Sequence, residues 1–426
     1  MIAHTPWRSL RYVLAAVAAL GLLVPVSAGP VLVGKPEDVG LSTERLRRVT
    51  EAMRRHVDAG DVAGVVTLAA RRGRIAHFEA QGLMNLEART PMAKDAMFRL
   101  ASMSKPVAGT AVMMLVEEGK IRLSDPISRF IPEFRNTKVA VPRQGGRGGA
   151  AGTPGAQGAA PAYDLVSATR EITIRDLLTH TSGLVSGGLG ASAAPRREPN
   201  DTLASYIPKL GAVPLDFQPG TLWRYSGQAG FDVLSRIVEI VSGQTFDVFL
   251  KQRLFDPLGM KDTTFVLADS QPRVPILYQR GPNGLQAAPR VTNSTYFSGA
   301  GGLVSTAEDY LQFAQMMLNR GEMNGRRFLS PRTVALMTTN HTGDLVNGQF
   351  GRPERGMGFG LSVQVVQDPA AADLRVSKGS WGWAGGTGVS FWIEPEEQMV
   401  SIFLIQGSGA GTRPDFENAL RQAIID

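Results

Sequence analysis

The chain has 426 residues, 43% of them hydrophobic and 19% charged, which is enough for one large core or two closely packed domains. It contains no cysteine, which excludes disulfides, cysteine-rich zinc sites and a thiol nucleophile. The five histidines, at positions 4, 56, 77, 180 and 341, are too scattered for a short-range metal pair, and the formal charge of +7 comes without a basic block. We therefore expect no metal, no cofactor and no nucleic-acid partner.

The first 28 residues have the pattern of a secretory signal peptide. Arg8 and Arg11 precede an apolar stretch from about Tyr12 to Val26, and Val26-Ser27-Ala28 is a small-residue cleavage site. A permanent membrane anchor is the alternative, but the apolar stretch is short for a membrane span. The pattern predicts a periplasmic or secreted protein with no stable membrane anchor after cleavage.

The two ends of the mature chain carry matching elements. Residues 42–60 have helical spacing of apolar side chains, and two strand-like runs follow at 64–70 and 74–82, joined at Arg72-Gly73. Near the other end, strand-like runs at 389–393 and 399–406 precede a helical pattern at 414–425. This order predicts an α/β fold of the α+β type, with one antiparallel sheet built from both chain ends and flanked by helices.

The middle of the chain is rich in helices and turns. Residues 230–243, 245–260 and 330–340 are amphipathic. We expect a mainly helical second domain over 101–299, and a sheet domain made of 29–100 and 300–426. The stretch 143–162 is dense in glycine and alanine, which predicts a mobile surface insertion.

A serine and a lysine lie three residues apart in Ser102-Met103-Ser104-Lys105, at the head of a long apolar helical run. A serine hydroxyl needs a neighbouring base to become nucleophilic, and residues three apart on a helix share one face. The N–H groups of a helix start also favour the negative charge that develops in acyl transfer. An ordinary helix start is the alternative, since four-residue matches of this kind occur by chance.

Two further segments carry candidate site residues. Tyr225, in "PGTLWRYSG", is expected at a loop-to-helix junction, where a nearby lysine would lower its pKa and let it exchange protons with Ser102. Gly385 and Gly386, in "GWAGGTGVSFWIEP", are expected to begin a strand that substrate can approach closely, with one N–H completing an oxyanion hole. Taken singly, the tyrosine could be a packed aromatic and the glycines part of a plain edge strand.

These segments, in this order, resemble the serine β-lactamase and penicillin-binding-protein superfamily, and within it the family VIII carboxylesterases that are similar to class C β-lactamases. The resemblance covers nearly the whole mature chain and includes "FRLASMSKP", "ITIRDLLTHTSGL", "PLGMKDTTF" and "GAGGLVSTAEDYLQF" as well as the two segments above. It implies a β-lactamase-like fold and an acyl-enzyme mechanism.

The resemblance also implies roles for individual residues. Ser102 would be the acylated nucleophile, Lys105 its partner, and Tyr225 the general base and acid. The backbone N–H groups of Ser102 and Gly386 would bind the oxyanion. His180 falls in an element that we interpret as structural, not as a triad histidine.

Departures from the family pattern indicate the substrate. The superfamily's Lys-Thr-Gly, which suits a substrate carboxylate, is replaced by Trp383-Ala384-Gly385, and its Tyr-x-Asn by Tyr225-Ser226-Gly227. An apolar wall formed by Trp383 and Gly385 favours neutral esters, so we expect a serine carboxylesterase for short-chain esters with at most weak β-lactam hydrolysis. The alternatives are a β-lactamase, a D-aminopeptidase or a D-alanyl carboxypeptidase of the same fold, and a non-catalytic sensor.

Overall fold

The computed structural model describes residues 31–143, 163–267, 271–289, 295–346, 355–407, 409 and 411–426. The expected signal peptide, and the glycine-rich insertion apart from Arg143, lie outside the described residues. The α-helices are α1 (Thr43–Asp58), α2 (Ser104–Glu117), α3 (Ile174–Leu178), α4 (Leu203–Tyr206), α5 (Ala229–Ser242), α6 (Phe246–Leu250), α7 (Asp256–Leu258), α8 (Ala307–Leu318), α9 (Pro331–Met337) and α10 (Thr412–Arg421).

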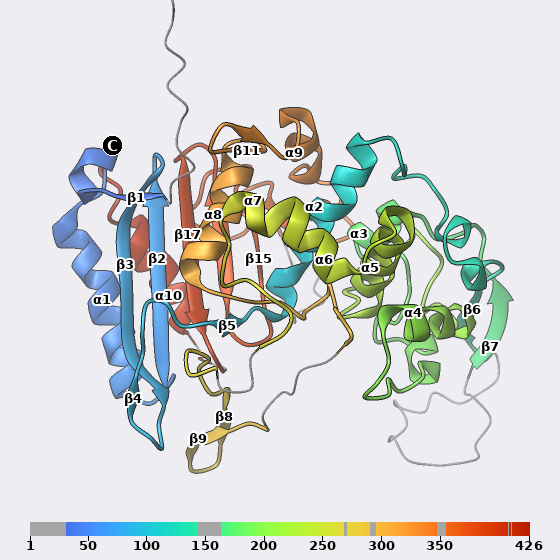
Figure 1. Ribbon diagram of the computed structural model, residues 1–426, viewed down its shortest axis with the longest axis horizontal. Helices are drawn as coiled ribbons and strands as arrows, with labels where there is room; N and C mark the ends of the chain where they lie inside the picture. The colour runs from blue at the N-terminus through green and yellow to red at the C-terminus, as the bar shows by residue number, and fades with distance from the viewer. Residues whose placement is uncertain are drawn as a thin grey trace, which may run out of the picture.

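A nine-stranded sheet takes strands from both ends of the chain, as predicted (Figure 1). Its order is β1-β3-β2-β17-β16-β15-β14-β13, and β4 pairs with β3. The sheet is not purely antiparallel as predicted, because β1 runs parallel to β3 at one edge. Its strands are β1 (Leu32–Val33), β2 (Gly64–Arg71), β3 (Arg74–Asn85), β4 (Thr90–Pro91), β13 (Met357–Phe359), β14 (Gln364–Val366), β15 (Trp381–Ala384), β16 (Ser390–Glu394) and β17 (Met399–Ile405).

The two faces of this sheet belong to different cores because side chains alternate along a strand. On β2, Val65 and Ala69 pack with α1 and α10, whereas Val66 and Leu68 belong to the large core on the opposite face. The side chain of Ser42 accepts a hydrogen bond from the Arg45 N–H and caps α1. The prediction that helices from both chain ends pack on the sheet is confirmed, and the structure places α1 and α10 together on one face.

The large core joins the other face of the sheet to the central helices. Helix α2 is buried over most of its length, contacts α5, and lies between the sheet and the helical half of the molecule in Figure 1. The helix predicted over 245–260 is present as one uninterrupted helical segment, in which α6 passes through a π-helical turn (Lys251–Phe255) into α7. The remaining strand pairs are small: β5 (Phe98–Arg99) with β10 (Val304–Ser305), β6 (Lys138–Pro142) with β7 (Tyr163–Ser167), β8 (Tyr278–Gly281) with β9 (Gly284–Ala287), and β11 (Glu322–Met323) with β12 (Arg326–Arg327).

None of the helices in these described ranges is both long enough and apolar enough to cross a membrane. The division of the chain at residues 100 and 300 stays a prediction.

Candidate active site

Ser102 lies in a tight turn at the entrance to α2. The turn is the 3-10 helix η2 (Ala101–Met103), so Ser102 precedes the α-helix on which the sequence places it, and Lys105 lies in the first helical turn. Ala101, directly before the serine, has a φ of 44°, in the left-handed region that residues with a side chain rarely adopt. The surrounding structure therefore imposes the conformation of this turn.

Lys105 is completely buried and is held by three oxygen atoms. Its Nζ atom lies 3.2 Å from Ser102 Oγ, 2.7 Å from the carbonyl oxygen of Gly227 and 2.8 Å from the carbonyl oxygen of Ala300. The two carbonyl groups can only accept hydrogen bonds, so they take up two of the N–H bonds of the amine. The remaining bonding position of the Lys105 nitrogen faces Ser102 Oγ.

Burial lowers the pKa of Lys105 to about 7, against an opposing effect from the negative charge of Asp232. A substantial fraction of the lysine is therefore neutral at pH 7. With two N–H bonds already donated to carbonyl groups, the lone pair of the neutral amine faces Ser102 Oγ. Lys105 is thus placed to accept the serine proton.

Tyr225 is the second side chain in contact with Ser102. Its hydroxyl group lies 2.6 Å from Ser102 Oγ, and its ring lies 5.0 Å from Lys105 Nζ. The residue sits four positions before α5, at the loop-to-helix junction that the sequence predicts. The structure thus brings together all three residues of the predicted catalytic set.

The predicted lowering of the Tyr225 pKa is wrong. Burial raises the pKa of Tyr225, and hydrogen bonds with Ser102 and Trp383 offset only part of this effect. The phenol is therefore protonated at neutral pH and donates its hydrogen bond to Ser102. The sequence argument considered the charge of the lysine but could not include the desolvation of the phenol.

His180 packs against the Tyr225 ring. The two ring centroids are 4.6 Å apart, and His180 Nδ1 accepts a hydrogen bond from the Ser226 N–H at 3.3 Å. Burial, and secondarily the charge of Lys105, lower the pKa of His180 well below its usual value, so the ring is neutral. Nδ1 is an acceptor, so Nε2 carries the hydrogen, and within the described residues it has no hydrogen-bond partner. This position fits the structural role predicted for His180.

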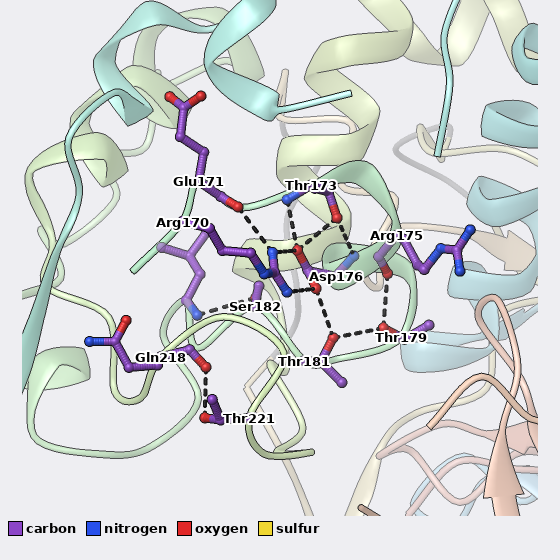
Figure 2. Close-up of polar contacts among 11 residues, drawn as sticks. Arg170, Glu171, Thr173, Arg175, Asp176, Thr179, Thr181, Ser182, Gln218 and Thr221 are labelled. Atoms are coloured by element: carbon purple, nitrogen blue, oxygen red, sulfur yellow. Dashed lines mark hydrogen bonds and ion pairs between the residues drawn. The ribbon is translucent and has the colours of Figure 1, made fainter. Parts of the chain in front are cut away.

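A polar cluster centred on Asp176 holds the turn that contains His180 (Figure 2). Asp176, in α3, accepts hydrogen bonds from Arg170 at 2.6 and 2.9 Å, from the Thr173 N–H and hydroxyl, and from the Thr181 hydroxyl at 3.2 Å. The carbonyl oxygen of Thr181 accepts from the Gly220 N–H at 2.8 Å. The cluster therefore ties α3 to the segment that leads to Tyr225.

The glycines of the third segment lie elsewhere than predicted. Gly385 and Gly386 do not begin a strand; they follow β15 and form the turn into β16. A side chain at Gly385 would come within 2.2 Å of the Leu100 carbonyl oxygen, whereas nothing lies within 4 Å of the same position at Gly386. The turn is also fixed by Thr387, whose hydroxyl donates to the Arg99 carbonyl oxygen at 2.7 Å. It thus packs against the residues directly before the Ser102 turn.

Trp383 packs on the same cluster of rings. It is 8% exposed, and its ring centroid is 5.5 Å from that of Tyr225 and 5.2 Å from that of Phe359. Strand β15 lies between β14 and β16, so the edge-strand alternative does not hold. Trp383 thus packs its ring against Tyr225 and is also a hydrogen-bond partner of the tyrosine hydroxyl.

Sequence reasoning missed the groups that hold Lys105. The carbonyl oxygens of Gly227 and Ala300 are backbone atoms without a sequence signature. Asp232 is one of two acids in the amphipathic helix α5, and only its burial distinguishes it. No group of three or more His, Asp or Glu side chains within the described ranges is arranged to hold a metal ion.

Comparison with known proteins shows what this chain is similar to. The model of the Beta-lactamase family matches residues 49–424. Protein Rv1367c of Mycobacterium tuberculosis is 37% identical over 373 residues, which cover 83% of this chain and 88% of that protein. Esterase EstB of Burkholderia gladioli is 32% identical over 395 residues, which cover 85% of this chain and 91% of the esterase.

A similar solved structure is that of EstCE1, described as a hydrolase with promiscuous acyltransferase activity. It superimposes with a TM-score of 0.72 at 25% identity, over 90% of this chain and 99% of EstCE1.

Proposed function

The chain belongs to the Beta-lactamase family, as a serine hydrolase of that fold, and from this premise we propose that it is a carboxylesterase. It hydrolyses short-chain carboxylic esters through an acyl-enzyme on Ser102. The observation that carries the proposal is the contact of one serine oxygen with both Lys105 Nζ, at 3.2 Å, and the Tyr225 hydroxyl, at 2.6 Å. Ser102 Oγ can therefore lose its proton to Lys105 while Tyr225 donates a hydrogen bond to the site.

The proposed reaction starts with neutral Lys105. The amine accepts the Ser102 proton as Oγ attacks the ester carbonyl, and the tetrahedral oxyanion receives hydrogen bonds from the backbone N–H groups of Ser102 and Gly386. Tyr225 donates its proton to the departing alkoxide and regains one from protonated Lys105. Water then attacks the acyl-enzyme with the same groups acting in reverse, which releases the carboxylic acid and restores Ser102.

This assignment of the base differs from the one implied by the family resemblance. The resemblance makes Tyr225 the general base, whereas burial moves the pKa values of Tyr225 and Lys105 in the directions that favour lysine as acceptor and tyrosine as donor. The two groups form one hydrogen-bonded unit around Ser102, so removal of either should impair acylation.

The substrate assignment rests on the strand beside the serine. Trp383-Ala384-Gly385 provides no cation for a substrate carboxylate, and Trp383 faces the catalytic tyrosine with an apolar ring. A neutral ester suits this wall better than an anionic β-lactam or a peptide carboxylate. A relative over most of the chain, EstB, is named an esterase, which supports the proposal.

The alternatives are a β-lactamase and a D-aminopeptidase or D-alanyl carboxypeptidase. These enzymes would use the same serine, lysine and tyrosine, so the catalytic set does not distinguish them. A non-catalytic sensor would need no such set, and the presence of all three side chains in contact argues against it.

The test is the turnover of p-nitrophenyl butyrate and of a chromogenic cephalosporin, measured side by side on the purified chain with Ser102→Ala as control. We expect ester turnover far above cephalosporin turnover, and neither in the variant. Equal or dominant cephalosporin turnover would contradict the esterase assignment. Full ester turnover in Ser102→Ala would show that another nucleophile acts.

We also propose that the protein is periplasmic or secreted and acts on a small-molecule ester, without a nucleic-acid partner or a stable membrane anchor. The supporting observation is the signal-peptide pattern of residues 1–28. The N-terminal residue of the protein recovered from its native cell envelope or culture medium tests the cleavage. A chain that still begins at Met1 in the membrane fraction would contradict it.

A further inference from the structure

Asp232 is a buried acid that the proposed reaction does not use. It lies in α5, seven residues after Tyr225, and is 3% exposed. Its carboxylate accepts hydrogen bonds from the Ser298 hydroxyl at 2.6 Å, the Tyr296 hydroxyl at 3.0 Å and the Ala300 N–H at 3.2 Å. Three hydrogen bonds on one buried carboxylate are the arrangement that an ionised acid requires in the protein interior.

All three donors belong to the short segment 296–300, which leads to Lys105. Ala300 donates its N–H to Asp232 and accepts at its carbonyl oxygen from Lys105 Nζ at 2.8 Å. A side chain at Gly299 would come within 2.1 Å of Ser235 Oγ in α5 and 3.0 Å of Ala108 Cβ in α2. The segment is therefore clamped between the two helices, with one residue connecting the acid to the lysine.

The charges of the two groups act on each other without direct contact. The negative charge of Asp232 opposes the lowering of the Lys105 pKa by burial. Burial raises the pKa of Asp232, and its three hydrogen bonds and the charge of Lys105 oppose that rise. Acid and lysine therefore stabilise each other's charged form in a medium where each alone would be costly.

The other ionisable groups around the pair lie on two sides. Tyr225 and His180 face Lys105, and both are neutral at pH 7 because burial shifts their pKa values away from it. On the Asp232 side are Tyr296 and Tyr206, whose pKa values burial raises, and Arg197, whose guanidinium lies 4.4 Å from the Tyr296 ring. Lys105 is the group of this set with a pKa near neutrality.

We propose that Asp232 is a positioning residue for Lys105, which holds segment 296–300 so that the Ala300 carbonyl group orients the amine toward Ser102, and which sets the charge balance of the lysine. The inference rests on the proposed function in taking Lys105 as the group that activates Ser102. It predicts that the acid acts through the lysine and does not touch the substrate.

The test substitutes Asp232→Asn, which keeps the shape of the side chain and removes its charge. Two readouts follow over a pH series: the rate at which a fluorescent phosphonate labels Ser102, and the 13Cε NMR resonance of Lys105, assigned by its absence in Lys105→Ala. Loss of the negative charge should move the Lys105 titration, and with it the midpoint of the labelling rate, to lower pH by roughly 0.5–1 unit. The maximum labelling rate should fall severalfold because the amine is less well oriented.

Asp309→Asn is the matched control. Asp309, in α8, is also buried and accepts hydrogen bonds from the Thr263 hydroxyl and the Asp262 N–H, both at 2.8 Å, but its charge does not contribute to the pKa of Lys105. This variant should lose stability and leave both midpoints in place. An Asp232→Asn protein with both midpoints unchanged would overturn the inference, as would an equal shift in the control.

Failure of the proposed function, or of the variant to fold, can be told apart from failure of the inference. If wild-type Ser102 is not labelled, the proposed function fails, and the NMR titration alone still decides the inference. If Asp232→Asn does not fold, Ser298→Ala replaces it, since that variant keeps the acid and removes its shortest hydrogen bond. A smaller shift in the same direction would then support the inference, and an unchanged midpoint and maximum rate would overturn it.

Discussion

The hydroxyl group of Tyr225 lies 2.6 Å from Ser102 Oγ, although 123 positions separate the two residues in the chain. Lys105 approaches the same oxygen from the helix that follows it. Ser102 is thus contacted by two groups. One is the amine of Lys105, whose pKa is lowered by burial, and the other is the protonated hydroxyl of Tyr225, whose pKa is raised by burial. This arrangement is the basis of the predictions below.

The first prediction concerns pH. Because burial lowers the pKa of Lys105 to about 7, and the amine must be neutral to accept the Ser102 proton, kcat/KM for p-nitrophenyl butyrate should rise with pH and reach half its plateau near pH 7. Below about pH 6 the rate should fall about tenfold per unit. Lys105→Arg, which stays protonated, should be inactive throughout. A midpoint below pH 5 would indicate a carboxylate base and contradict the assignment.

The second prediction concerns the tyrosine. Tyr225→Phe removes the hydroxyl that donates to Ser102 and leaves the ring on His180 and Trp383. Loss of one general acid–base group typically costs 10²- to 10⁴-fold in rate, and we expect kcat to fall within that range. Tyr206→Phe is the control, because its hydroxyl donates to the Pro195 carbonyl oxygen and should not affect kcat. Wild-type kcat in Tyr225→Phe would contradict the role.

Much of this site and its sheet could be predicted because the relevant residues lie close together in the sequence or form recognisable strand patterns. The spacing of Ser102 and Lys105 and the position of Tyr225 ahead of a helix are visible in the sequence, as are the strand-like runs that form β2, β3, β16 and β17. The turn position of Gly385 was not predictable, since "GWAGGTG" contains both a strand end and a turn. The direction of the Tyr225 pKa shift and the role of Asp232 depend on burial, which arises only when distant segments pack together.

The third prediction concerns the paired glycines. Gly385→Ala places a methyl group within 2.2 Å of the Leu100 carbonyl oxygen, so the β15–β16 turn must move away from the segment before Ser102. We expect a loss of about 1–3 kcal/mol in the free energy of unfolding, together with reduced phosphonate labelling. Gly386→Ala has open space around the new methyl group and should unfold like the wild type. Equal stability of the two variants in urea unfolding would contradict the close approach at Gly385.

The fourth prediction concerns the cluster of Figure 2. Burial raises the pKa of Asp176, but hydrogen bonds from Arg170 and Thr173 outweigh this effect and hold it below its ordinary value. The stabilisation that this acid provides is present above the unfolded-state pKa, near 4, and is lost as the pH falls through the lower folded-state pKa. Asp176→Asn should therefore cost about 1–2 kcal/mol at pH 7, a modest value because Arg170 is partly exposed, and less below pH 4.

Urea unfolding of wild type and Asp176→Asn at pH 7 and at pH 3.5 provides the comparison. A stability difference that grows as the pH falls would contradict the sign of the shift. Thr221→Ala is the control: it removes the exposed hydrogen bond from its hydroxyl to the Gln218 carbonyl oxygen, drawn in Figure 2, and should change stability little at either pH.

The central claim is that Ser102 forms an ester with the acyl group of the substrate. The most direct test is intact-mass and peptide mass spectrometry after rapid acid quench of the protein with p-nitrophenyl butyrate. We predict a mass increase of one butyryl group, located on the peptide that contains Ser102 and absent in Ser102→Ala. A butyryl group on another residue, or ester turnover with an unmodified Ser102 at every quench time, would contradict the account.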